Sequence, residues 1–144
     1  MEKLIITMEA TCDMPSYILD KYDLRVIDME FMIDGEVKST KTDTVVSSQL
    51  YSKMKKGSKT STSQINSELY EEFFLTQLQE DCDILHIAFS SGLSGTGATA
   101  REVADRLNRN NEHKIYVVDS LCACSGQGLL AMLARDYSKD HRGT

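Results

Sequence analysis

The sequence has a shortage of basic residues: 16 lysines and arginines stand against 22 aspartates and glutamates, for a formal net charge of −6 at pH 7. A protein that binds nucleic acid through the phosphate backbone usually has the opposite balance, so we expect no nucleic-acid partner. No apolar run approaches the ~20 residues of a membrane span, which argues against stable membrane insertion. The first ten residues lack the charged and apolar regions of a signal peptide, so we expect a cytoplasmic protein.

Cysteines are few, and their spacing does not suit a metal site. They are Cys12, Cys82, Cys122 and Cys124. One residue separates Cys122 from Cys124, whereas zinc ligands usually have two to four residues between them. In a cytosolic protein such thiols are normally reduced. We therefore expect no metal, no disulfide and no cofactor.

The glycine and serine motifs of common enzymes are also absent. The stretch FSSGLSGTGATA (residues 89–100) has glycines in the order G-x-x-G-x-G, which is not the dinucleotide fingerprint G-x-G-x-x-G. No lysine completes a Walker loop, and GLSGT is not the hydrolase motif G-x-S-x-G. The histidines are His86, His113 and His141. None of them is placed by the sequence to activate Ser94 as a nucleophile, so we expect a protein that is not an enzyme.

Two aspartates keep an enzymatic alternative open. Asp13 and Asp119 both follow strand-like stretches, and a pair of carboxylates can perform acid–base chemistry. The simpler interpretation is that each aspartate braces its own loop. The alternative function is therefore an enzyme that acts on a small carboxylated or phosphorylated metabolite.

The sequence does contain the pattern of one α/β domain. Hydrophobic residues make up 41% of its 144 residues, which is enough for a real core. Strand-like and helix-like stretches alternate, which predicts a mostly parallel sheet flanked by helices. Asp34-Gly35 is a strong hairpin signal and predicts an antiparallel edge on that sheet.

Polar segments follow several of the predicted strands and helices. Ligands of open α/β sheets bind beyond the carboxyl ends of the strands, so we expect several of these segments to converge at one edge. They are Thr11–Asp13, Thr60–Gln64, Ser90–Thr96 and Asp119–Ser120.

The segment Ser90–Thr96 is the strongest candidate for a binding loop. Gly92 and Gly95 allow a tight turn, and Ser94 stands where the next helix should begin. The free N–H groups at a helix start favour a negative group. The alternative is that Ser94 only caps its helix.

Thr60–Gln64 supplies neutral hydroxyls, which suit a carboxylate that must be both bound and released. The alternative is an ordinary turn before the next helix, with Ser63 or Ser67 as its cap.

Four stretches, in this order, resemble the N-terminal domain of the DegV family of bacterial fatty acid-binding proteins. They are ITMEATCDMP, KTSTSQINSE, ILHIAFSSGLSGTGATA and KIYVVDSLCACSGQGLLA. The first departs from the family, which usually has Asp-Ser where this chain has Glu9-Ala10. In the second, Ile65 and Asn66 replace a common Pro-Ser. In the third, Gly97 and Ala98 stand where an aromatic residue and glutamine are common.

The resemblance implies an α/β fold and a long-chain fatty acid held by its carboxylate. By motif, Thr62 and Ser94 would contact the carboxylate, with Ser63, Ser91 and Gly95 beside them. Whether the first or the last serine of Ser90–Ser94 makes the main contact stays open.

The resemblance also implies that the acyl group is presented to a fatty acid kinase. Residues 1–144 would form the N-terminal domain, and the family's second domain would be absent from this chain. A lipid-binding protein is thus the leading hypothesis, with the metabolite enzyme and a regulatory module as alternatives.

Overall fold

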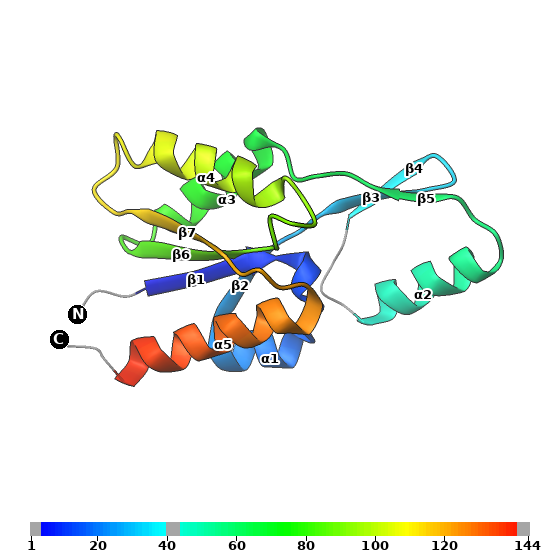
Figure 1. Cartoon of the computed structure of the whole chain (residues 1–144), viewed down its shortest axis with the longest axis horizontal. Helices are drawn as coiled ribbons and strands as arrows, with labels where there is room; N and C mark the ends of the chain where they lie inside the picture. Colours follow the sequence, from blue (N-terminus) through cyan, green and yellow to red (C-terminus); the bar gives the residue numbers. More distant parts are fainter. Residues whose placement is uncertain (1–3, 40–43, 141–144) are drawn as a thin grey trace.

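A four-stranded parallel sheet lies at the centre of the molecule (Figure 1). The structure is a computed structural model that describes residues 4–39 and 44–140. Across the sheet, the strands are β2 (Leu24–Ile27), β1 (Leu4–Glu9), β6 (Asp83–Ala88) and β7 (Ile115–Asp119).

Strand β1 is central because nearly all of its side chains are apolar or fully paired. Five of its six residues are buried, as expected for a parallel strand covered on both faces. Its register places Ile6 beside Leu24 of β2 and beside Leu85 of β6. The strands of the sheet are therefore held by both backbone pairing and side-chain packing.

Helices cover both faces of the parallel sheet. In Figure 1, one face is covered by α3 and α4 and the other by α1 and α5. Their bounds are Ser67–Leu78 for α3, Thr96–Leu107 for α4, Ser16–Tyr22 for α1 and Cys124–Asp140 for α5. Each face has its own core cluster. The fold class predicted from the sequence, a mostly parallel sheet flanked by helices, is confirmed.

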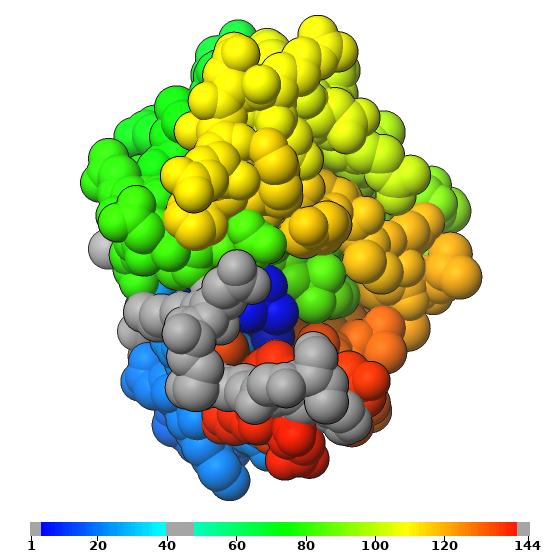
Figure 2. Space-filling view, turned by 90° about the vertical axis from the view of Figure 1, so that its left-hand side faces the viewer, coloured from blue at the N-terminus to red at the C-terminus, as the bar shows by residue number. Residues whose placement is uncertain are grey.

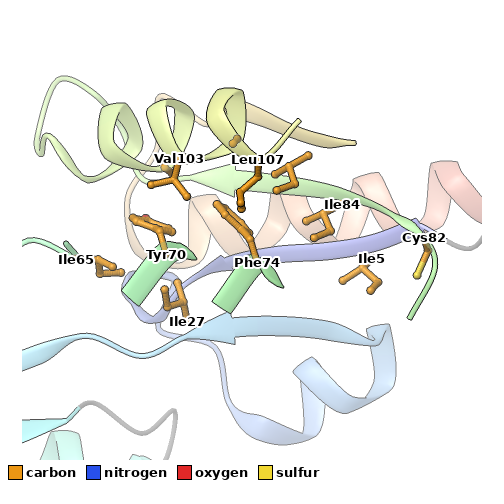
Figure 3. Packing of buried hydrophobic residues seen from close by; sticks show 12 residues of the cluster. Ile5, Ile27, Ile65, Tyr70, Phe74, Cys82, Ile84, Val103 and Leu107 are labelled. Carbon is orange, nitrogen blue, oxygen red and sulfur yellow. The ribbon is translucent and has the colours of Figure 1, made fainter. Parts of the chain in front are cut away.

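The cluster under α3 and α4 shows why these segments are helical. Ala100, Val103, Ala104 and Leu107 repeat at helical spacing and are all buried. They share one cluster with Tyr70 and Phe74 of α3, and Figure 3 shows Val103 and Leu107 above these two rings. The two rings are stacked with centroids 5.5 Å apart.

A second, antiparallel sheet extends from one end of the parallel sheet (Figure 1). We call it the small sheet; its strands, in spatial order, are β4 (Glu36–Ser39), β3 (Glu30–Ile33) and β5 (Thr60–Thr62). Asp34 and Gly35 form the predicted hairpin turn with φ values of 50° and 86°, which a primed turn requires. Helix α2 (Thr44–Lys55) precedes β5 in the chain. Gly57, with a φ of 94°, lies in the turn between α2 and β5.

The chain leaves the parallel sheet at Asp28 and Met29, which separate β2 from β3. Two details of the small sheet differ from the sequence prediction. The hairpin pairs with β5, so it does not extend the edge of the parallel sheet. Thr60–Thr62 is an edge strand, whereas the sequence predicted that it belongs to a loop. Short polar strands of this kind carry no periodic apolar signal.

The order of strands creates a switch point between β1 and β6. From β1 the chain passes through α1 to β2 on one side, and β6 later adds on the other side of β1. Crevices at such points are the usual ligand sites of open α/β sheets. In Figure 1, the small sheet extends from the carboxyl end of the parallel strands. Figure 2 shows the opposite end of the molecule, with the loop after α4 in yellow and the end of α5 in red.

Candidate functional site

A cavity of about 380 Å³ lies where the segments after β1 and β6 meet the small sheet. We call it the switch-point cavity. Its lining residues are Thr11, Met29, Thr62, Ser63, Gln64, Phe89, Leu93, Ser94 and Thr96. None of these side chains carries a formal charge at pH 7, and hydroxyl groups alternate with apolar ones. Three of the four predicted polar segments therefore meet at one place.

Ser94 lies at the turn that leads into α4. Its backbone N–H donates to the carbonyl of Ser90 at 3.2 Å. Its Oγ accepts from the N–H of Thr96 at 3.2 Å and donates to Thr96 Oγ1 at 3.0 Å. The N-cap position itself is occupied by Gly95, so the prediction that Ser94 stands at the cap was one residue off. Ser94 nevertheless satisfies a free N–H of the first helical turn and also lines the cavity.

Thr62 and Ser63 form the opposite wall of the switch-point cavity. Thr62 is held there by the pairing of β5 with β3, in which it lies beside Phe31. Its hydroxyl has no hydrogen-bond partner among the residues that the structure describes, so it can bond to a ligand without breaking a bond within the protein. The Ser63 hydroxyl donates to the Glu30 carbonyl at 3.3 Å, leaving its lone pairs free.

Gly95 is close to the same wall through Gln64. A Cβ atom at position 95 would lie 2.9 Å from Gln64 Nε2, closer than real contacts allow. Glycine at this position therefore lets the Gln64 amide pack against the loop beside the switch-point cavity. Asn66, two residues further on, caps α3 by accepting from the N–H of Leu69 at 2.9 Å; Ser63 and Ser67, which the sequence suggested as caps, do not have this role.

Ser91 lies away from the other candidate residues. Its N–H donates to Asp119 Oδ1 at 3.2 Å, and both residues line a separate cavity of about 430 Å³. The Ser91 hydroxyl and the Leu121 N–H hold the pKa of Asp119 below its usual range. Asp119 thus braces two loops, which is the simpler of the two roles considered from the sequence. Asp13 is exposed and ends a 3-10 helix, η1 (Ala10–Cys12), at φ 53°.

A buried carboxylate lies beneath the switch-point cavity. Glu9, the last residue of β1, is 0% exposed. Its Oε1 accepts from the Tyr70 hydroxyl at 2.8 Å and from His86 Nε2 at 3.2 Å. Its Oε2 accepts from the Phe89 N–H at 3.0 Å and from Gln127 Nε2 at 2.6 Å. Burial alone would raise the pKa of Glu9, but His86 and Tyr70 together hold it below its ordinary value.

No motif in the sequence predicts this network. The only sign was the departure of Glu9-Ala10 from the usual Asp-Ser of the resembled family. His86 has a structural role: its Nδ1 lies 2.8 Å from Thr7 Oγ1, so both ring nitrogens are occupied inside the core. Burial and the neighbouring Glu9 raise the pKa of Tyr70 far above its usual range, so its hydroxyl stays a donor.

Gln127 connects the buried carboxylate to the cavity wall. It is 0% exposed and lies on α5, and its Oε1 accepts from the Thr11 hydroxyl at 2.8 Å. Its Nε2 also donates to the Ile87 carbonyl at 2.9 Å. Thr11 therefore lines the switch-point cavity with its hydroxyl already bonded on the protein side.

In residues 4–39 and 44–140, no group of acidic, histidine and cysteine side chains is arranged to hold a metal ion. The four cysteines are free, with Cys12 and Cys82 buried. None of the described helices is both long and apolar enough to cross a membrane.

Comparison with known proteins identifies the family. A family model described as "Uncharacterised protein, DegV family" matches residues 3–141. The chain belongs to the DegV family. A DegV domain-containing protein of Lactococcus lactis is 38% identical over 127 residues, which cover 87% of this chain and 44% of that protein.

Solved structures of DegV proteins have the same fold. A DegV lipid-binding protein of Thermotoga maritima superimposes with a TM-score of 0.86 and 28% identity, covering 96% of this chain and 49% of that one. A second Thermotoga maritima protein, whose structure is described as revealing a fatty acid binding function, gives a TM-score of 0.87 and 28% identity, covering 98% and 51%. The chain spans about half the length of each of these DegV proteins.

Proposed function

We propose that this DegV chain is a lipid-binding protein that holds a long-chain fatty acid by its carboxyl group. The observation that carries the proposal is the switch-point cavity, in which hydroxyls from β5 and from the segments that follow β1 and β6 lie among apolar side chains with no formal charge. Thr62 and Ser94 contact the carboxyl group, with Ser63 and Gly95 beside them; Ser91 shapes the loop from its other side.

Affinity and orientation come from different parts of the ligand. Burying an acyl chain gains ~0.8 kcal/mol per CH₂, so the tail supplies most of the binding free energy. The apolar side chains of Met29, Phe89 and Leu93 offer the start of such a surface. The hydroxyl groups then fix where the carboxyl end lies. The fatty acid binding described for a Thermotoga maritima relative supports this assignment.

Lipid extraction and titration test the proposal. We expect mass spectrometry of lipid extracted from the purified protein to detect a fatty acid, and hexadecanoic acid to bind saturably. Thr62→Val should weaken this binding by about tenfold, since one hydrogen bond to the head group is lost. Ser61→Ala is the matched control, because Ser61 precedes Thr62 on β5 and faces the other way. Absence of saturable binding, or equal losses in both variants, would contradict the proposal.

Presentation of the bound acid to a fatty acid kinase is the second part of the proposal. It rests on the family resemblance. In this step a kinase transfers the γ-phosphoryl group of ATP to the carboxylate, giving acyl phosphate and ADP, while the DegV chain itself has no catalytic role. The check is acyl phosphate formation by a candidate kinase with and without the chain. If the kinase phosphorylates free fatty acid equally well without the chain, this second part of the proposal is wrong.

A further inference from the structure

The buried network around Glu9 fixes the orientation of Gln127. Gln127 Nε2 lies within hydrogen-bond distance of both Glu9 Oε2 and the Ile87 carbonyl oxygen. A carbonyl oxygen can only accept, so Gln127 must direct its amide nitrogen toward Ile87 and Glu9.

The orientation of Gln127 decides the direction of its bond to Thr11. Both amide hydrogens of Gln127 are used, one on Glu9 and one on the Ile87 carbonyl. Its oxygen therefore faces Thr11, and the Thr11 hydroxyl must donate to it at 2.8 Å. A hydroxyl has a single proton. Toward the switch-point cavity, Thr11 consequently offers only lone pairs.

We infer that Gln127 is a positioning residue that holds Thr11 as a hydrogen-bond acceptor in the switch-point cavity, so that the site favours an uncharged carboxylic acid or primary amide head group over an ionised carboxylate. This inference rests on the proposed function. A carboxylic acid that keeps its proton has an acceptor for the Thr62 hydroxyl and a donor for Thr11. An ionised carboxylate has acceptors only.

The electrostatics of the cavity favour the same head group. None of the side chains that line it is cationic, so an incoming carboxylate finds no charge partner there. Only Gln127 separates the Glu9 carboxylate from the Thr11 hydroxyl in this series of hydrogen bonds. Burying a second anion near the first costs more than burying a neutral group.

Three ligands with the same tail separate these possibilities. Dodecanamide offers both donor and acceptor, whereas methyl dodecanoate and ionised dodecanoate offer acceptors only. At pH 8 we expect the wild-type chain to bind dodecanamide about tenfold more tightly than either of the others, because Thr11 finds a donor only in the amide. The readout is the ratio of the dissociation constants, which a purely structural loss of affinity leaves unchanged.

Variants of Thr11 and Gln127 test the mechanism. Thr11→Val should bring the ratio close to one, and Thr11→Ser should restore it. Gln127→Met frees the Thr11 hydroxyl to donate, so dodecanoate should gain relative to dodecanamide. Tyr70→Phe is the control, because it removes one donor to Glu9 and leaves the contact between Gln127 and Thr11 intact.

The outcomes distinguish the two proposals. If dodecanoate binds as tightly as dodecanamide and Thr11→Val changes nothing, the acceptor role is overturned while fatty acid binding stands. If Gln127→Met and Tyr70→Phe shift the ratio equally, the positioning role is overturned. If none of the three ligands binds saturably, the proposed function fails, and this inference fails with it.

Discussion

Replacing Glu9 by glutamine tests how much the buried carboxylate stabilises the fold. The amide keeps one acceptor oxygen and places an NH₂ group where the second oxygen was, so two of the four donors described above lose their acceptor. A hydrogen bond to a charged group is worth ~1.5–3 kcal/mol. Part of this loss is offset, because the variant no longer buries a charge. We expect Glu9→Gln to lower the free energy of unfolding at pH 7 by about 2–4 kcal/mol.

The same variant should change how stability depends on pH. The pKa of Glu9 is lowered in the folded state, so its contribution is fully present above the unfolded value of about 4.3. It is lost as the pH falls through the lower, folded value. The stability difference between wild type and Glu9→Gln should therefore stay constant from pH 7 to about pH 5 and shrink in more acidic solution.

Urea unfolding across this pH range measures both effects. With an m-value of about 2 kcal/mol per M in urea, in the middle of the usual range for a small domain, the midpoint should move by about 1–2 M at pH 7. Glu112→Gln is the matched control, since Glu112 is exposed in the turn before β7. A Glu9→Gln variant as stable as wild type would refute the reasoning. So would a difference that persists undiminished well below pH 4.

Three further substitutions have defined outcomes. Ser94→Ala should cost ~1 kcal/mol of stability, because a hydrogen bond at the start of α4 is lost, and should weaken fatty acid binding about tenfold. Thermal melting measures the first effect and ligand titration the second. Unchanged affinity would leave Ser94 with a structural role only. Gly128→Ala places a Cβ 2.5 Å from Met14 Cγ and should lower the free energy of unfolding by ~1–3 kcal/mol. Adding Met14→Ala should relieve the clash, so the double variant should lose less stability than the sum of the two single variants. Additive losses in urea unfolding would contradict the clash. Asn66→Ala should cost ~1 kcal/mol of stability by removing the α3 cap; an unchanged midpoint would show that the cap bond contributes nothing.

The parallel sheet could be predicted from the sequence because its residues carry a strong periodic signal. The buried runs of β1 and β6 and the apolar stripe of α4 are visible in single-sequence patterns. The small sheet gave a weaker signal. Its strand Thr60–Thr62 contains three polar residues, and only the pairing with β3 makes it a strand.

Only the hydroxyl-rich segments of the candidate site could be predicted from the sequence, because they carry a local signal in their composition. Thr62 and Ser94 lie in loop-like, hydroxyl-rich segments that composition can reveal, and the structure brings them to one cavity. The contacts among Glu9, Tyr70 and Gln127 join residues 61 and 118 positions apart. No local pattern encodes such a network, because it depends on strand order and on which side of the sheet α5 packs.

One wall of the switch-point cavity belongs to the small sheet and the other to segments that follow strands of the parallel sheet, and this has a thermodynamic consequence. A head group bound between Thr62 and Ser94 adds a non-covalent link between the small sheet and the segment that follows β6 of the parallel sheet. Any ligand that binds only this arrangement stabilises it by mass action, by ~2.7 kcal/mol at a hundred times its dissociation constant. Ligand concentration would therefore set the fraction of molecules in which the two sheets are locked together, and the bound lipid would act as a reversible crosslink between them.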